Sequence, residues 1–186
     1  MFGLGLLFIG FSLWFFRDPD PDPAPAAEAY LAPAHGVVDI VDEVTESEFM
    51  GGPCRRVSIF LSVFDVHVQN APAPGRVVYR RHHAGEFLNA LNLDSAARNE
   101  NLMFGLENEA VPGERVGVRL IAGWIARRIV PWAEQGDAVA HGERIGLIQF
   151  GSRVNLYLPL TAQLQVGLRQ RVRGGVTIIA TRAKSA

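Results

Sequence analysis

Proline occupies every second position from residue 19 to residue 25, in the run Asp-Pro-Asp-Pro-Asp-Pro-Ala-Pro. Because proline lacks a backbone N–H and fixes φ, this run forms neither a helix nor a central strand. The repeat therefore predicts an extended spacer over residues 17–29. It divides the chain into a hydrophobic segment, residues 1–16, and a single domain, residues 30–186.

The hydrophobic segment contains no charged residue and ends in Trp14, Phe15 and Phe16, directly before Arg17. As a helix it would span about 24 Å, less than the roughly 30 Å of a bilayer's hydrocarbon core. Aromatic residues followed by a basic one are typical of the membrane interface. We expect a membrane anchor, either a short span or half of an embedded hairpin; the alternatives are a buried core helix and a start codon further upstream. A removed signal peptide is not expected, because no basic region precedes the run and no Ala-x-Ala site follows it.

The charge is unevenly distributed along the 186 residues. The net charge of −1 combines −8 over residues 1–50 with +7 over residues 51–186, and the stretch from Ser152 onward has six basic residues and no acidic one. This asymmetry fits an anionic partner, which can be phospholipid head groups, nucleic acid or an acidic ligand; ordinary solvated surface is the alternative. A hydrophobic content of 48% excludes a disordered chain.

Two residue types occur only once, Lys184 and Cys54. With one lysine, next to the C-terminus, a lysine-borne Schiff base and pyridoxal phosphate are not expected. One cysteine allows neither an intrachain disulfide nor a cysteine zinc site, and we expect Cys54 to be buried. The histidines lack the i, i+4 spacing of a helical metal pair, so no metal is expected.

The domain has the pattern of short strands. Val37–Val41 and Val57–Leu61 are β-rich runs. The segment Ala32–Val38 is echoed by Ala71–Val77, and each predicts a turn that leads into a strand.

A second echo has the form G-x-x-V-x-x-G-x-x-I, in Gly136–Ile145 and nearly again in Leu168–Ile178, where glycines permit tight turns between strands. We therefore predict a mainly β (α+β) fold, a small β-sandwich or barrel with hammerhead-like elements of the biotinyl and lipoyl carrier type. Helices are expected to be few and short: Ala84–Asn92 is a candidate helix, and Ala122–Val130 is a helix or a buried strand.

One dipeptide, Gly151-Ser152, lies between two predicted strands. A serine Oγ behind the preceding carbonyl can attack it, which moves the acyl group from nitrogen to oxygen and forms an ester. β-Elimination breaks the ester, and the dehydroalanine left behind hydrolyses to a pyruvoyl group and ammonia. Such a ketone would supply a carbonyl for Schiff-base chemistry, which we do not expect from lysine-bound pyridoxal phosphate in a chain with one lysine. A plain turn serine is the alternative.

Short segments in a fixed order surround this dipeptide. Together they resemble the short form of phosphatidylserine decarboxylase proenzymes, over nearly the whole chain. The segments are Phe15-Phe16-Arg17-Asp18-Pro19, Pro33-Ala34-His35-Gly36, Phe64-Asp65-Val66-His67-Val68, Asn70-Ala71-Pro72, Asn99-Glu100, Ile121-Ala122-Gly123, Ala126-Arg127-Arg128-Ile129 and Phe150-Gly151-Ser152-Arg153-Val154.

The resemblance implies a pyruvoyl-dependent enzyme that cleaves itself between Gly151 and Ser152 into a β-chain, 1–151, and an α-chain, 152–186. The pyruvoyl group from Ser152 would form a Schiff base with the amine of phosphatidylserine, release CO₂ and yield phosphatidylethanolamine. The two chains would stay together as a heterodimer, and a homodimer of heterodimers is left open. The enzyme would attach to the cell membrane as a peripheral or monotopic protein, with its catalytic domain in the cytoplasm. Its partner would be phosphatidylserine in an anionic membrane, and nucleic acid is not expected as a partner.

The resemblance also implies roles for individual residues. His67 stands where the family uses a histidine around decarboxylation, and a core histidine bonded to backbone is the alternative. His35 replaces the family's aspartate, so we expect His35 to deprotonate Ser152, with His67 assisting, or self-cleavage to be slow. Arg127 and Arg128 are candidates for binding the lipid phosphate.

Two geometric expectations accompany these roles. Asp65 to His67 are expected to form a strand that places the Asp65 carboxylate on the same face as the imidazole.

Two other functions remain open: a pyruvoyl decarboxylase of another amino-acid head group or of a soluble amino acid, and a membrane-tethered, non-enzymatic β-barrel adaptor.

Overall fold

The structure is a computed structural model that describes residues 2–21, 26–86, 99–108, 111, 113–123, 128–149 and 152–183. Strands dominate it, and the described residues contain one helix, α1 (Phe2–Phe15). The prediction of a mainly β chain is confirmed. The candidate helix Ala84–Asn92 lies outside the described residues beyond Glu86, and the segment Ala122–Val130 lies outside them at 124–127.

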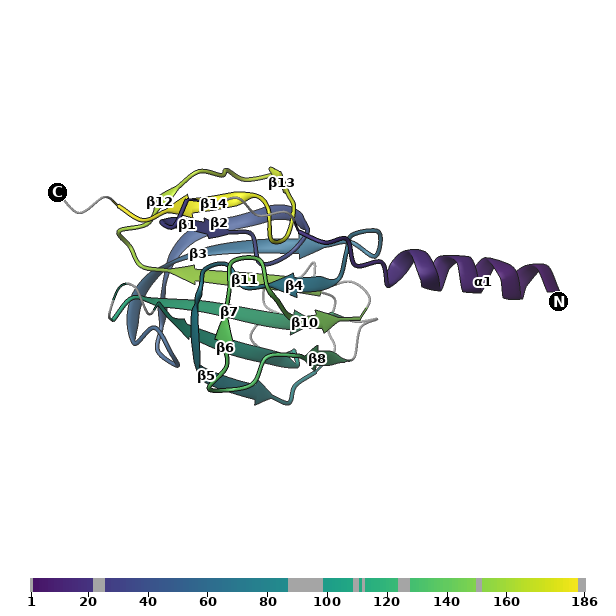
Figure 1. Cartoon of the computed structure of the whole chain (residues 1–186), viewed down its shortest axis with the longest axis horizontal. Coiled ribbons are helices and arrows are strands. Elements are labelled where there is room, and N and C mark those ends of the chain that lie inside the picture. Colours follow the sequence, from purple (N-terminus) through teal and green to yellow (C-terminus); the bar gives the residue numbers. More distant parts are fainter. Residues whose placement is uncertain are drawn as a thin grey trace.

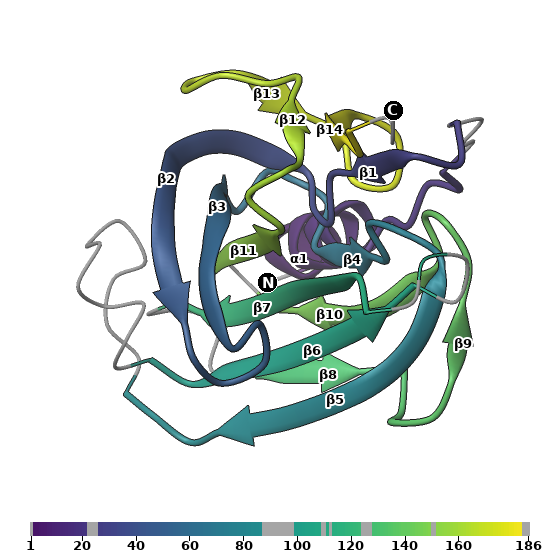
Figure 2. The same cartoon turned by 90° about the vertical axis from the view of Figure 1, so that its left-hand side faces the viewer.

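The main sheet has eight antiparallel strands and curls into a half-barrel (Figure 1, Figure 2). Strand β11 lies between β3 and β7, so the residues from Ser152 onward are inserted among strands that precede them. The spatial order is β13 (Arg171–Val172), β2 (Gly36–Glu46), β3 (Gly52–Leu61), β11 (Ser152–Leu158), β7 (Arg115–Ala122), β6 (Asn101–Glu107), β5 (Gly75–His83) and β9 (Ala138–Val139).

Two antiparallel sheets of three strands complete the domain. One joins the two ends of the domain in the order β1 (Ala29–Leu31), β14 (Ile178–Thr181) and β12 (Gln163–Leu164). The other has the order β4 (Val68–Asn70), β10 (Arg144–Ile148) and β8 (Ile129–Pro131).

The core contains side chains from all three sheets. In β11, Val154, Leu156 and Leu158 belong to the large cluster, whereas Tyr157 lies on the opposite face in a smaller cluster with Cys54. Both faces of β11 are therefore covered, and each buried large apolar side chain contributes about 1.5–3 kcal/mol to stability. Cys54 is fully buried, as predicted.

The strand and turn predictions are confirmed at several places. The runs Val37–Val41 and Val57–Leu61 lie in β2 and β3. Both members of the first echo form a turn that enters a strand, β2 at Gly36 and β5 at Gly75. In the second echo, Gly142 and Gly175 adopt φ values of +71° and +69° in turns between short strands.

Helix α1 is apolar on every side and projects from the domain (Figure 1). Among the described residues, no helix is long and apolar enough to cross a membrane. Beyond α1, Asp18 and Asp20 each form an ion pair of 2.6 Å with Arg144, so this part of the spacer is tied to the domain.

Candidate active site

Ser152 is the first residue of β11 and lies opposite Leu61 on β3 and Ala122 on β7. The residue is fully buried, and its Oγ has no hydrogen-bond partner among the described residues. A buried hydroxyl without a partner costs about 1–3 kcal/mol, so its presence calls for an explanation. A nucleophile held for reaction with its own backbone is such an explanation. Gly151, the other half of the predicted cleavage site, lies outside the described residues.

His67 lies in the loop between β3 and β4 and is 1% exposed. Its Nδ1 is 2.8 Å from the backbone oxygen of Asp65. Because a carbonyl oxygen only accepts, Nδ1 carries the hydrogen and donates it, which leaves the lone pair on Nε2. Burial lowers the pKa of His67 from 6.5 to about 4. At neutral pH the imidazole is therefore a neutral base.

The expected strand through Asp65 and His67 is wrong, because residues 62–67 form a loop between β3 and β4. The Asp65 carboxylate accepts hydrogen bonds from the backbone N and Oγ of Ser62, at 2.9 and 2.7 Å, and pairs with Arg171. The carboxylate thus fixes the loop, and the Asp65 carbonyl orients the imidazole. A serine followed three residues later by an aspartate is a sequence signal for this kind of turn.

His35 is half-buried in the turn before β2. Burial lowers its pKa, and the nearby guanidinium of Arg173 lowers it further. Gly36 adopts φ of +150°, and a Cβ there would lie 2.2 Å from the backbone oxygen of Phe60, so only glycine fits after His35. Asp65 and Arg17 act on both His35 and His67, which places the two histidines in one charged neighbourhood.

Ser152 and His67 lie at the same end of the domain. The loop that contains His67 starts directly after Leu61, the β3 residue opposite Ser152. On its other side, the His67 carbonyl accepts a hydrogen bond of 3.1 Å from the backbone N of Ile148, the last residue of β10. The chain between Ile148 and Ser152 is short, so backbone contacts bring His67, which was predicted to assist the base, and Ser152 into one region.

The two arginines predicted to bind phosphate differ in what the structure describes. Arg127 lies outside the described residues. Arg128 is exposed, and its carbonyl accepts a hydrogen bond of 3.2 Å from the backbone N of Gln149. Arg128 therefore lies beside the segment that leads to Ser152.

Several residues at this end were not predicted to have a role. Phe15 packs on the His67 ring, and Arg17 donates a hydrogen bond of 2.8 Å to the carbonyl of Phe64. Arg153 is buried and pairs with Asp39. Each of these contacts joins residues far apart in sequence, which no local pattern indicates. In the described part of the chain, no group of three His, Cys, Asp or Glu residues is placed to hold a metal ion.

Known proteins resemble this chain over most of its length. The family model described as phosphatidylserine decarboxylase matches residues 8–180. A phosphatidylserine decarboxylase proenzyme of Symbiobacterium thermophilum is 43% identical over 169 residues, which cover 91% of this chain and 78% of the relative. Proenzymes of the same name are 43% identical over 175 residues in Carboxydothermus hydrogenoformans (94% and 80% covered) and 39% identical over 174 in Desulfotalea psychrophila (94% and 80%). The chain belongs to the phosphatidylserine decarboxylase family.

Proposed function

We propose that this chain decarboxylates phosphatidylserine to phosphatidylethanolamine with a pyruvoyl group formed from Ser152. Self-cleavage between Gly151 and Ser152 would give a β-chain, 1–151, and an α-chain, 152–186. The observation that supports this best is the buried Oγ of Ser152, which has no partner in the described residues. Within the described part of the chain, the Ser152 hydroxyl makes no hydrogen bond that an alanine would lose.

The surroundings of Ser152 fit a pyruvoyl group. Leu61 and Ala122 flank it with apolar side chains, and neither would react with a ketone. When present, the group supplies an electrophilic carbonyl that binds the substrate amine and withdraws electrons from the carbon that loses CO₂. Lys184 is the chain's single lysine, so pyridoxal phosphate bound to a lysine is not expected to supply the carbonyl for a Schiff base. A carbonyl generated from Ser152 would supply it instead.

We assign His67 as the base that takes the Ser152 hydroxyl proton during self-cleavage. The donated hydrogen on Nδ1 directs the basic lone pair to Nε2, and the lowered pKa keeps the ring neutral. His35 is the second candidate base, since its pKa is lowered as well. His35→Ala that matures at the wild-type rate removes His35 from this role, and His67→Gln tests His67 in the same way.

The two chains would remain associated after cleavage. Strand β11 of the α-chain is paired on both sides with β-chain strands, and β14 is paired with β1. Both faces of β11 are buried as well. The mature protein would therefore be an αβ heterodimer whose pyruvoyl end lies among β-chain strands.

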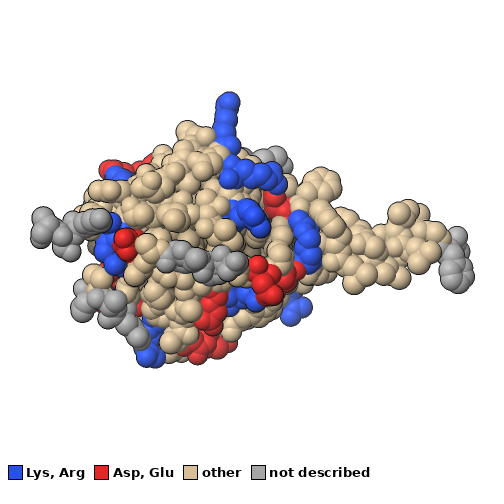
Figure 3. All heavy atoms as spheres, turned by 45° about the horizontal axis from the view of Figure 1, so that its top comes forward, with Lys and Arg blue, Asp and Glu red and all other residues tan. Residues whose placement is uncertain are grey.

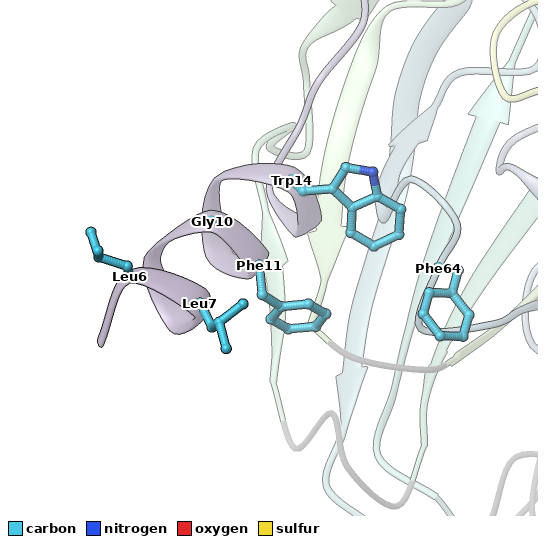
Figure 4. Close-up of a pocket in the computed structure, with 6 residues that line it drawn as sticks. All are labelled: Leu6, Leu7, Gly10, Phe11, Trp14 and Phe64. Carbon is cyan, nitrogen blue, oxygen red and sulfur yellow. The ribbon is translucent and has the colours of Figure 1, made fainter. Parts of the chain in front are cut away.

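We further propose that α1 attaches the domain to a membrane surface as a peripheral or monotopic element. A helix that is apolar all round is stable only in an apolar environment. Figure 4 shows an apolar groove between α1 and the loop after β3. Its lining is Leu6, Leu7, Gly10, Phe11, Trp14 and Phe64.

Charge supports the same placement. Figure 3 shows basic side chains, with acidic ones among them, on the domain surface beside the base of α1. Arg171 is exposed and pairs with Asp65, a residue of the loop that contains His67. Arg128, with the undescribed Arg127, remains our candidate for the lipid phosphate. We also propose that two pairs of short strands, β9 with β10 and β13 with β14, resemble the hammerhead of biotinyl and lipoyl carriers. This resemblance concerns architecture alone.

The activity is tested with vesicles that contain phosphatidylserine labelled in its carboxyl group. We expect the purified protein to release labelled CO₂, and hydroxylamine, which reacts with ketones, to abolish the release. Ser152→Ala should release none. Release by Ser152→Ala, or release unaffected by hydroxylamine, contradicts the proposal. Activity on free serine without lipid would assign a soluble substrate instead.

A further inference from the structure

The end of α1 contacts the loop that contains His67 at three places. The ring centroids of Phe15 and His67 are 4.5 Å apart, and those of Trp14 and Phe64 are 6.0 Å apart. Arg17 binds the Phe64 carbonyl at 2.8 Å. Side chains of the last turn of α1 and of Arg17 just beyond it thus join the helix to the loop.

Phe15 differs from the other large side chains of α1 in its direction. It is 1% exposed, whereas Phe8 on the same helix is 70% exposed. Phe15 therefore contacts the domain, and Phe8 faces away from it. The contact is with a ring that the proposed mechanism uses.

We infer that Phe15 is a positioning residue: its phenyl ring holds the imidazole of His67 in the orientation that proton transfer at Ser152 requires. The hydrogen bond at Nδ1 holds one edge of the imidazole. The Phe15 ring packs against the imidazole and restricts its orientation further. Precise placement of a base matters, because an error of about 1 Å can cost a hundredfold in rate.

The contact also excludes water from the imidazole. The charged groups that act on it among the described residues are Asp65, in its own loop, and Arg17, at the end of α1. Asp65 raises its pKa and Arg17 lowers it, while burial has the largest effect. Removal of the Phe15 ring should therefore hydrate His67 and move its pKa back toward 6.5.

The test compares Phe15→Leu with Phe8→Leu, which makes the same chemical change on the exposed side of α1. Phe15→Tyr is the conservative variant that keeps a ring. Each full-length precursor is made by cell-free translation, and the rate of self-cleavage is followed on gels between pH 4.5 and 8. We expect Phe15→Leu to be about tenfold slower at pH 7. We also expect the pH of its half-maximal rate to rise by at least one unit, while Phe8→Leu and Phe15→Tyr keep the wild-type profile.

A wild-type profile for Phe15→Leu overturns the inference, and so does an equal shift in Phe8→Leu. If Phe15→Leu loses cleavage at every pH and Phe15→Tyr loses it as well, Phe15 is needed for folding alone. That result also overturns the inference. The inference rests on the proposed role of His67, which His67→Gln tests separately. If His67→Gln is inactive and Phe15→Leu is normal, only the inference fails; if His67→Gln cleaves normally, the proposed role fails.

Discussion

The guanidinium of Arg153, the residue after Ser152, is bound to the carboxylate of Asp39 on β2 at 2.9 and 2.6 Å. It also donates a hydrogen bond of 2.7 Å to the hydroxyl of Ser58 on β3. The Arg153 side chain is only 2% exposed. The start of β11 is therefore fastened across two neighbouring strands, directly beside the proposed cleavage site.

Asp39→Asn should destabilise the protein strongly, because it leaves a buried guanidinium without its charged partner. The expected cost is about 3 kcal/mol. The matched control is Asp42→Asn, since Asp42 is also an aspartate of β2 that pairs with an arginine, Arg56 on β3, but the side chains of that pair are 24% and 38% exposed. That variant should lose about 1 kcal/mol or less. Urea unfolding of both, in an uncleavable Ser152→Ala background, measures the difference; equal losses would contradict this account.

Ser152→Ala should abolish self-cleavage without weakening the fold. Because the Oγ has no partner in the described residues, its removal ends a buried, unsatisfied group and breaks no bond. The free energy of unfolding should stay constant or rise by about 1 kcal/mol. Urea unfolding compares this variant with an uncleaved wild-type precursor that is unfolded directly after synthesis. A loss of about 2 kcal/mol would mean that the hydroxyl is bonded in the precursor.

Acid should destabilise the precursor through its buried histidines. The pKa of His67 is about 4 in the folded chain and 6.5 ordinarily, so between these values the unfolded state binds more protons. Stability is therefore complete above pH 6.5 and lost as the pH falls toward 4, by about 3 kcal/mol from His67. His35, whose pKa is also lowered, acts in the same direction.

In the Ser152→Ala background, His67→Gln should flatten this pH dependence. Urea unfolding at pH 7.5 and at pH 4.5 gives the comparison for both proteins. The protein that keeps His67 should lose more stability between pH 7.5 and pH 4.5 than the His67→Gln variant. The difference should be a few kcal/mol, on the order of the His67 contribution. The same loss with and without His67 would show that the histidine is already charged in the folded chain.

Asp65→Ala should slow self-cleavage about tenfold or more, because it releases the loop that orients His67. Arg171→Ala is the control: Arg171 pairs with the same carboxylate, but its side chain is 69% exposed. That pair should contribute about 0.5 kcal/mol, so Arg171→Ala should cleave within about twofold of the wild type. Rates on gels at pH 7 decide the point. If both variants are equally slow, the ion pair rather than the Ser62 contacts holds the loop.

Local patterns predicted a large part of this fold. β-rich runs marked β2 and β3, and glycines marked the turns at Gly142 and Gly175. Each of these depends on the backbone preferences of neighbouring residues, which the sequence displays directly. The strand predicted at Asp65 to His67 was wrong because the prediction relied on the same local preferences. Phe64 and Val66 favour a strand, but Ser62 and Asp65 close a turn.

The arrangement of the site could not be predicted in this way. Phe15 meets His67, and Arg153 meets Asp39, only because the sheet brings distant segments together. The alternative for His67, a core histidine bonded to backbone, describes its burial and its Nδ1 contact, but the extent to which burial lowers its pKa could not be predicted from the sequence. That property follows from packing, which depends on the whole fold.

If Ser152 becomes a pyruvoyl group through self-cleavage, the mass spectrum of the purified protein should reveal it. We expect two chains, 1–151 and 152–186, with the second lighter by one ammonia than the same chain begun by serine. Treatment with borohydride should add two hydrogens to that chain alone. A single intact chain of 20.3 kDa after long incubation would contradict the account.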